Sequence, residues 1–154
     1  MTSSEDILFV MKLDELRAMV KKDLSVDPTE LDIASLLVPQ IHSKYLNILM
    51  DEKLVLKKLK LELSVMRKDK WEFYSGKMSE ERLKELNIEP FGLKILRQDL
   101  DKYLDADQDL ISIHTKIAFS EEKVEYLIGV VKAVSNLHWS IRSAIDWKKF
   151  THGA

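Results

Sequence analysis

The chain of 154 residues contains no cysteine, and it has only four glycines and three prolines. Without cysteine it can form neither a disulfide framework nor a thiolate metal cluster, and we expect a reducing intracellular compartment. An average chain has about 7% glycine and about 5% proline, so the shortage of turn-forming residues argues against sandwiches, barrels and Rossmann-type folds. The longest apolar run near the start, residues 7–11, is far too short for a membrane span of about 20 residues. We therefore expect one all-α domain without a membrane segment.

Recognisable catalytic and metal-binding motifs are also missing. The sequence has no GxxxxGK[ST] or GxGxxG phosphate loop, and its four histidines match no local metal-ligand spacing. Asp105, Asp107 and Asp109 resemble the start of a calcium-binding loop. Leu110 stands where that loop needs glycine, however, and Lys116 stands where glutamate would close it. We expect no metal, no cofactor and no catalysis by this chain.

The charges are segregated along the chain. The formal net charge is −2, with 24 basic and 26 acidic residues. Residues 53–77 contain eight Lys or Arg against three Asp or Glu, a local charge of +5, which leaves −7 for the remainder. Local potential decides attraction to phosphate, so this segment is the candidate for a polyanion partner. The alternative is an ordinary solvated helix face.

Helical signals run through the N-terminal half. Residues 1–10 read as an extension, and the apolar spacing over residues 11–24 predicts a short amphipathic helix. Asp27 as N-cap and Pro28 at the first helical position predict a second start, with a pattern that continues to Tyr74. Pro39 should kink or break it, which gives a short helix, a bend and a long basic helix over residues 40–74. Gly76 then suits a left-handed C-cap, followed by a small helix over residues 79–86.

The C-terminal half carries a heptad seam. We expect helix over residues 93–104 and again to Phe150, with a break or cap at residues 105–107. Apolar residues then recur at steps of three and four, interrupted only by Ser120 and His138. The seam and a second apolar row beside it predict self-association, with an ordinary bundle core as the open alternative. The seam residues are Leu110, Ile113, Ile117, Val124, Leu127, Val131, Val134, Ile141 and Ile145.

A basic and aromatic stripe follows the long helix. Its members lie at steps of three and four and therefore share one face, with cations first and rings last: Lys53, Lys57, Lys60, Ser64, Arg67, Trp71 and Tyr74. Lys68 and Lys70 flank this stripe. Ammonium groups neutralise phosphates and rings stack on unpaired bases, so the stripe predicts single-stranded DNA binding with little sequence preference. The alternative is that the aromatic residues pack beneath the following connector. The candidate DNA-binding residues are Lys53, Lys57, Lys58, Lys60, Arg67, Lys68, Lys70, Trp71 and Tyr74.

Three stretches resemble a known family in the same order and with similar spacing. They are MKLDELRAMVKKDLSVDPTEL from Met11, KDKWEFYSG ending at Gly76, and LDADQDLISIHTKIAF from Leu104. Together they resemble the UvsY family of recombination mediators of T-even-like bacteriophages. In that family a Lys-x-Arg pair before two aromatics, Ser and Gly is implicated in DNA binding, and the matching residues are Lys68 and Lys70. Lysine in place of arginine at position 70 keeps the charge and loses the planar fork.

The resemblance implies an all-α protein that forms a closed homo-oligomeric ring, of hexamer or heptamer class, through its C-terminal helices. It implies a DNA-binding part over residues 11–76, a connector over residues 77–92 and an oligomerisation part over residues 93–154. The implied partners are single-stranded DNA, a RecA-like recombinase of the UvsX type and the phage single-strand-binding protein. The implied role is recombinase loading in recombination, repair and recombination-dependent replication, in the cytoplasm of an infected bacterium. Met11 is a possible start of the protein, since residues 1–10 precede the likeness.

A second interpretation needs no DNA. A helical coiled-coil adaptor or scaffold could use the basic stripe to contact an acidic protein partner. A helical enzyme is a third class, for which the sequence names no residue.

Overall fold

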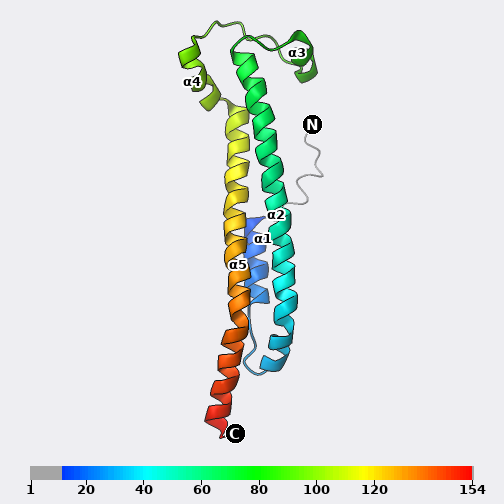
Figure 1. The fold of residues 1–154 in the computed structure, drawn as a ribbon, viewed down its shortest axis with the longest axis vertical. Helices are drawn as coiled ribbons and strands as arrows, with labels where there is room; N and C mark the ends of the chain where they lie inside the picture. The colour runs from blue at the N-terminus through cyan, green and yellow to red at the C-terminus, as the bar shows by residue number, and fades with distance from the viewer. Residues whose placement is uncertain (1–11, 154) are drawn as a thin grey trace. The chain divides into compact units, whose positions relative to one another are not determined.

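The computed structural model describes residues 12–153, and in this range it contains helices, turns and loops but no strand (Figure 1). The all-α prediction is confirmed. The predicted N-terminal extension lies outside the described residues. The helices are α1 (Leu13–Asp23), α2 (Leu31–Tyr74), α3 (Glu80–Leu86), the 3₁₀ turn η1 (Arg97–Asp99), α4 (Leu100–Asp105) and α5 (Gln108–His152). None of these helices is long and apolar enough to cross a bilayer.

The chain divides into two compact units that share the two longest helices. Unit 1 takes the described parts of residues 1–53 and 122–154, and unit 2 takes residues 54–121. In unit 1, α1 lies against the first part of α2 and the last part of α5 (Figure 1). Its fully buried side chains include Leu16, Tyr45 and Leu127. Asp23 ties α1 to α2, because its Oδ2 accepts hydrogen bonds from Lys44 Nζ at 2.6 Å and from the Tyr45 hydroxyl at 2.8 Å.

The start of α2 differs from the prediction. Helix α2 begins at Leu31 rather than at Pro28. The Asp27 carboxylate accepts bonds from the backbone N–H of Thr29 at 2.8 Å and from its hydroxyl at 2.6 Å. The Glu30 N–H also donates to the Asp27 carbonyl at 3.1 Å, so residues 27–30 close a separate turn before the helix, and the predicted helix start at Asp27 and Pro28 is wrong.

Pro39 does not divide α2 into two helices. The helix runs without interruption from Leu31 to Tyr74 with Pro39 inside it, so the predicted break is wrong. Proline removes one donor to the carbonyl four residues earlier, here that of Ser35. Ser35 and Pro39 are both exposed, so water can satisfy that carbonyl, while the neighbouring Val38 is buried and holds the turn in place.

The turn after α2 and the small helix that follows are as predicted. Gly76 has φ +72°, and its N–H donates to the Phe73 carbonyl at 3.2 Å. Ser79 caps α3 by accepting from the Arg82 N–H at 3.2 Å, and Asn87 ends it in the left-handed conformation at φ 53°. The sequence therefore predicts the end of α2 and the position of α3 correctly.

The predicted helix over residues 93–104 is correct only at its end. Helical structure starts with η1 at Arg97, and residues 90–96 form no helix. Leu93 and Leu96 are exposed, so an apolar helix face in this segment would have nothing to cover it. The buried residues nearest to this segment, Leu100, Leu104 and Leu110, form a hydrophobic cluster of unit 2 against which the half-buried Ile95 packs.

The heptad seam of α5 is largely buried within the chain itself. Seven seam residues are buried, and Val131 and Ile145 are half-buried. His138, predicted at a core position, is exposed and bonds the Ser135 carbonyl through Nδ1 at 2.8 Å, so that assignment is wrong. The burial agrees with the bundle-core alternative, and a role of the seam in self-association stays a prediction. The buried seven are Leu110, Ile113, Ile117, Val124, Leu127, Val134 and Ile141.

Candidate nucleic-acid interface

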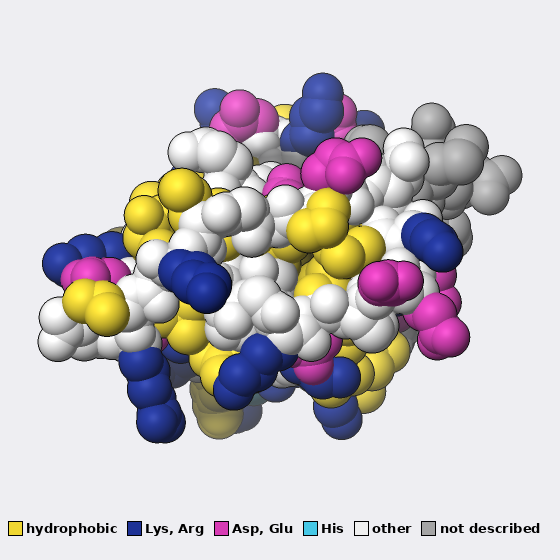
Figure 2. Space-filling view, turned by 90° about the horizontal axis from the view of Figure 1, so that it is seen from above, with side chains coloured by type: hydrophobic (Ala, Val, Ile, Leu, Met, Phe, Trp, Pro, Cys, Tyr) yellow, Lys and Arg dark blue, Asp and Glu magenta, His cyan; other side chains and the backbone are white. Residues whose placement is uncertain are grey.

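The cationic side chains predicted to bind DNA lie on α2 and most of them are exposed. In unit 2 the exposed ones are Lys57, Lys58, Lys60, Arg67 and Lys68, and Lys53 is exposed at the end of the first segment of unit 1. The face drawn in Figure 2 shows Lys and Arg side chains interspersed with acidic and hydrophobic ones.

The exposed cations differ in how far they are already neutralised. Lys60 pairs with Glu121 at 2.8 Å, and Lys68 lies 3.6 Å from Glu72 while its side chain stays 73% exposed. Within the part of the chain that the structure describes, Lys57 and Arg67 have no ion-pair partner. Among the candidate residues in unit 2, Lys57, Arg67 and Lys68 can thus meet phosphate at the lowest cost.

The aromatic residues at the end of α2 separate into two environments. The Trp71 side chain lies at the surface, 40% exposed, and Lys77 Nζ lies 4.8 Å from the centroid of its ring. Tyr74 is half-buried, with ring centroids 5.1 Å from Phe91 and 5.7 Å from Tyr103. Trp71 can stack on a base, whereas Tyr74 packs with the connector, as the alternative predicted.

Lys70, the second position matched to the family motif, has two carboxylate partners. Its Nζ lies 2.6 Å from Asp109 Oδ2 and 3.0 Å from Asp107 Oδ2, and its side chain is 25% exposed. The same Asp107 oxygen accepts the Tyr74 hydroxyl at 2.7 Å. Asp107 Oδ1 caps α5 by accepting from the N–H groups of Asp109 at 3.0 Å and Leu110 at 3.1 Å. Lys70 and Tyr74 therefore connect the last turns of α2 to the first turn of α5.

These contacts shift the pKa values of the three groups. Burial disfavours the charged Asp107, but bonds from Tyr74, the Leu110 N–H and Lys70 outweigh it and lower the pKa of this carboxyl. Burial together with the bond to Asp107 raises the pKa of Tyr74 to about 12. For Lys70 burial opposes the charge, but the bonds to Asp109 and Asp107 outweigh it and raise its pKa. Asp107 and Lys70 are both charged at neutral pH.

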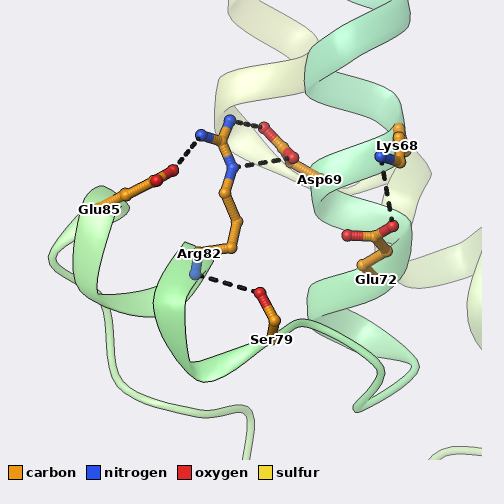
Figure 3. A network of polar contacts seen from close by, with 6 residues as sticks. All are labelled: Lys68, Asp69, Glu72, Ser79, Arg82 and Glu85. Carbon is orange, nitrogen blue, oxygen red and sulfur yellow. Dashed lines mark hydrogen bonds and ion pairs between the residues drawn. The ribbon is translucent and has the colours of Figure 1, made fainter.

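A second set of ion pairs holds α3 beside the stripe (Figure 3). Arg82 donates to both carboxylate oxygens of Asp69, at 3.3 Å from Nε and 2.6 Å from its terminal nitrogen, and also to Glu85 at 2.8 Å. The bonds to Asp69 and Glu85 raise the pKa of Arg82. Asp69 follows Lys68 directly, so α3 is fixed next to a candidate DNA contact. Sequence reasoning missed this pair, because only the turn at Gly76 brings residues 13 apart into contact.

The described residues contain no group of three or more His, Cys, Asp or Glu arranged to hold a metal ion. A small cavity of about 110 Å³ lies beside Arg67 and His114, over Leu104 and Leu110. Its volume is below the range of about 300–1,000 Å³ that is usual for small-molecule sites. A wider hollow of about 460 Å³ over Leu96, Arg97 and Gln98 is open to solvent, so neither of the two encloses a ligand.

Comparisons with known proteins find the same family that the sequence resembles. The family described as "Recombination, repair and ssDNA binding protein UvsY" matches residues 19–154. The recombination protein uvsY of Enterobacteria phage T4 is 22% identical over 143 residues, which cover 93% of this chain and 99% of that protein.

Solved structures share the fold. Two crystal structures of the bacteriophage T4 recombination mediator protein UvsY, in lattice types II and III, match with TM-scores of 0.79 and 0.71 at 21% and 18% identity. The matches cover 93% and 92% of this chain and 99% of each T4 chain. The resemblance predicted from the sequence is confirmed. The chain belongs to the UvsY family of recombination, repair and single-stranded-DNA-binding proteins.

Proposed function

We propose that this protein is a recombination mediator that binds single-stranded DNA and promotes loading of a RecA-like recombinase onto strands coated by single-strand-binding protein. The observation that carries the proposal is the set of exposed cations Lys57, Arg67 and Lys68 on the helix that also exposes Trp71. Phosphate neutralisation by these cations and stacking on the indole need no base edge. Binding is therefore tolerant of sequence, as a protein that acts on any exposed strand requires.

The remaining parts of the proposal follow from membership of the family. The protein acts without catalysis and without a cofactor, in phage recombination, repair and recombination-dependent replication in the cytoplasm of the infected bacterium. Its protein partners are a UvsX-type recombinase, the phage single-strand-binding protein and further copies of itself. A closed ring of hexamer or heptamer class repeats a modest site, and the repeated site gains affinity through its effective concentration.

The second candidate function is a helical adaptor or scaffold that contacts an acidic protein. It is favoured by apolar side chains that α2 exposes among the same lysines. Leu54, Leu61 and Val65 are 65%, 63% and 58% exposed. A surface of apolar and basic residues also suits a protein partner, so DNA binding has to be measured directly.

Fluorescence anisotropy with a labelled oligothymidylate at low and high salt separates the two functions. Replacing Lys57, Arg67 and Lys68 by alanine should weaken binding and lower the slope of log affinity against log salt by about 2, at about 0.7 for each phosphate contact. Three exposed lysines outside this surface, Lys21, Lys22 and Lys132, form the matched control, and their replacement should leave the slope unchanged. Wild-type protein that fails to bind at low salt would favour the adaptor.

A further inference from the structure

Lys70 bridges two carboxylates that differ in their environment. The Asp107 side chain is 4% exposed, whereas the Asp109 side chain is 67% exposed, and both lie within 3.0 Å of Lys70 Nζ. A lysine ammonium has three N–H donors, so Lys70 can bond both at once. The two carboxylates therefore compete with DNA for Lys70 to different extents.

Asp107 is a fixed partner. Its two oxygens accept from the Tyr74 hydroxyl, from Lys70 and from the N–H groups of Asp109 and Leu110. Separating Lys70 from it would leave a buried carboxylate without its cation, which is strongly unfavourable. The bond to Asp107 thus keeps the Lys70 ammonium in place whether or not DNA is bound.

Asp109 is an exchangeable partner. Within the described residues its carboxylate has one cation within ion-pair distance, Lys70 at 2.6 Å, and it faces solvent. Ion pairs with an exposed partner contribute little because water competes for both charges. A phosphate oxygen offers the same kind of acceptor with the same charge, and a strand held by neighbouring cations presents it at high effective concentration.

We propose that Asp109 is an internal competitor for DNA at Lys70: it occupies the phosphate position in the free protein and is displaced when a strand binds. This inference rests on the proposed DNA-binding function and concerns the regulation of that same site. Lys70 is neutralised until a strand is already held by Lys68 and its exposed neighbours. The exchange limits affinity, so that a strand held at Lys70 can be released again to a partner protein.

The test compares three single-residue variants for binding to labelled oligothymidylate at about 150 mM salt. Asp109→Asn keeps the size of the side chain and removes the competitor, and it should tighten binding by about threefold to fivefold. Asp101→Asn removes the same charge from an exposed position on α4 and should change binding by less than about twofold, since Asp101 forms no ion pair with a cation among the described residues. Asp109→Glu retains a carboxylate and should bind like the wild type.

The mechanism also predicts that the gain depends on Lys70. In a Lys70→Ala background, Asp109→Asn should no longer tighten binding, provided that circular dichroism shows intact helices. If that background loses its helices, the comparison of Asp109→Asn, Asp109→Glu and Asp101→Asn decides. Equal affinities of the two asparagine variants, or a gain that persists without Lys70, would overturn the inference alone. Wild-type protein that does not bind at low salt would overturn the proposed function, and the inference with it.

Discussion

Lys68 and Lys70 carry the same charge two residues apart, yet their side chains differ in exposure and in partners. The Lys68 side chain is 73% exposed with one distant partner, whereas Lys70 is 25% exposed and contacts a buried carboxylate. Their spacing on a helix turns them by about 200°, so they cannot share one environment. The sequence predicts their charge and their helix, but it does not show which of them faces the carboxylates that begin α5.

Asp107 makes the stability of unit 2 depend on pH. Its folded-state pKa lies below the ordinary value of 3.8, so its contribution is complete above that value and is lost as the pH falls through the folded value. Asp107→Asn should destabilise the protein at pH 7 by about 1–3 kcal/mol, because donors to a buried carboxylate lose their partner. At a pH below 3.8 the difference from wild type should be smaller, because this stabilisation is lost progressively as the pH falls towards the lowered folded-state pKa. Urea unfolding followed by circular dichroism at both pH values measures it.

Asp101→Asn is the control for this measurement, since Asp101 is exposed in the same unit. It should have little effect at either pH. If the stability difference between wild type and Asp101→Asn changed with pH as much as the difference between wild type and Asp107→Asn, protonation of Asp107 would not explain the pH dependence.

Among the elements, the segment from α2 to α3 shows what local sequence signals determine. Gly76 has the left-handed conformation that the sequence predicted, and α3 at Glu80–Leu86 lies within one residue of the predicted helix. The helix start at Asp27 and the break at Pro39 were wrong: the Asp27 bonds close a separate turn that ends before Leu31, and the buried Val38 packs the helix beside Pro39. Caps and turns predicted from neighbouring residues are reliable where no other local structure or packing uses the same groups.

Ion pairs between different helices cannot be predicted from such local sequence patterns. Lys123 and Glu52 form a 2.9 Å ion pair in unit 1, with side chains only 5% and 8% exposed, although 71 residues separate them. The pair depends on the register of α5 against α2, which apolar periodicity does not fix to a single turn. The contact of Lys70 with Asp109, 39 residues apart, was not predicted for the same reason.

The left-handed conformation of Gly76 gives a test at the scale of the turn. Gly76→Ala should destabilise the protein by about 1–2 kcal/mol, since an L-residue is strained at positive φ. An added Cβ would meet nothing within 4 Å, so the cost is one of backbone conformation alone. Gly92 has equal space and no positive φ, so Gly92→Ala should be neutral or slightly stabilising. Thermal unfolding of the two variants compares them, and equal melting temperatures would contradict the assigned strain.

At the scale of the whole molecule, the seam residues predicted to join subunits are mostly used within one chain. Val134 is completely buried, so a charge placed there would unfold the chain rather than separate subunits. The apolar side chains of α5 that remain uncovered in unit 1 include Trp139, Trp147 and Phe150, at 58%, 65% and 78% exposure. Periodicity identified an apolar helix with more than one apolar side, but it could not show which side the chain covers by itself.

These exposed aromatic side chains predict which substitutions should disrupt self-association. Replacing Trp147 and Phe150 together by glutamate should lower the molecular mass measured by light scattering while the helical signal stays unchanged, because both side chains lie outside the core of the chain. Affinity for oligothymidylate should fall as a consequence, since separate subunits lose the effective concentration of a repeated site. Lys149→Glu adds negative charge in the same turns at an exposed position and should retain the mass of the wild type. An unchanged mass in the double variant would show that subunits meet elsewhere, and the exposed apolar residues of α2, Leu54, Leu61 and Val65, would be the next surface to test.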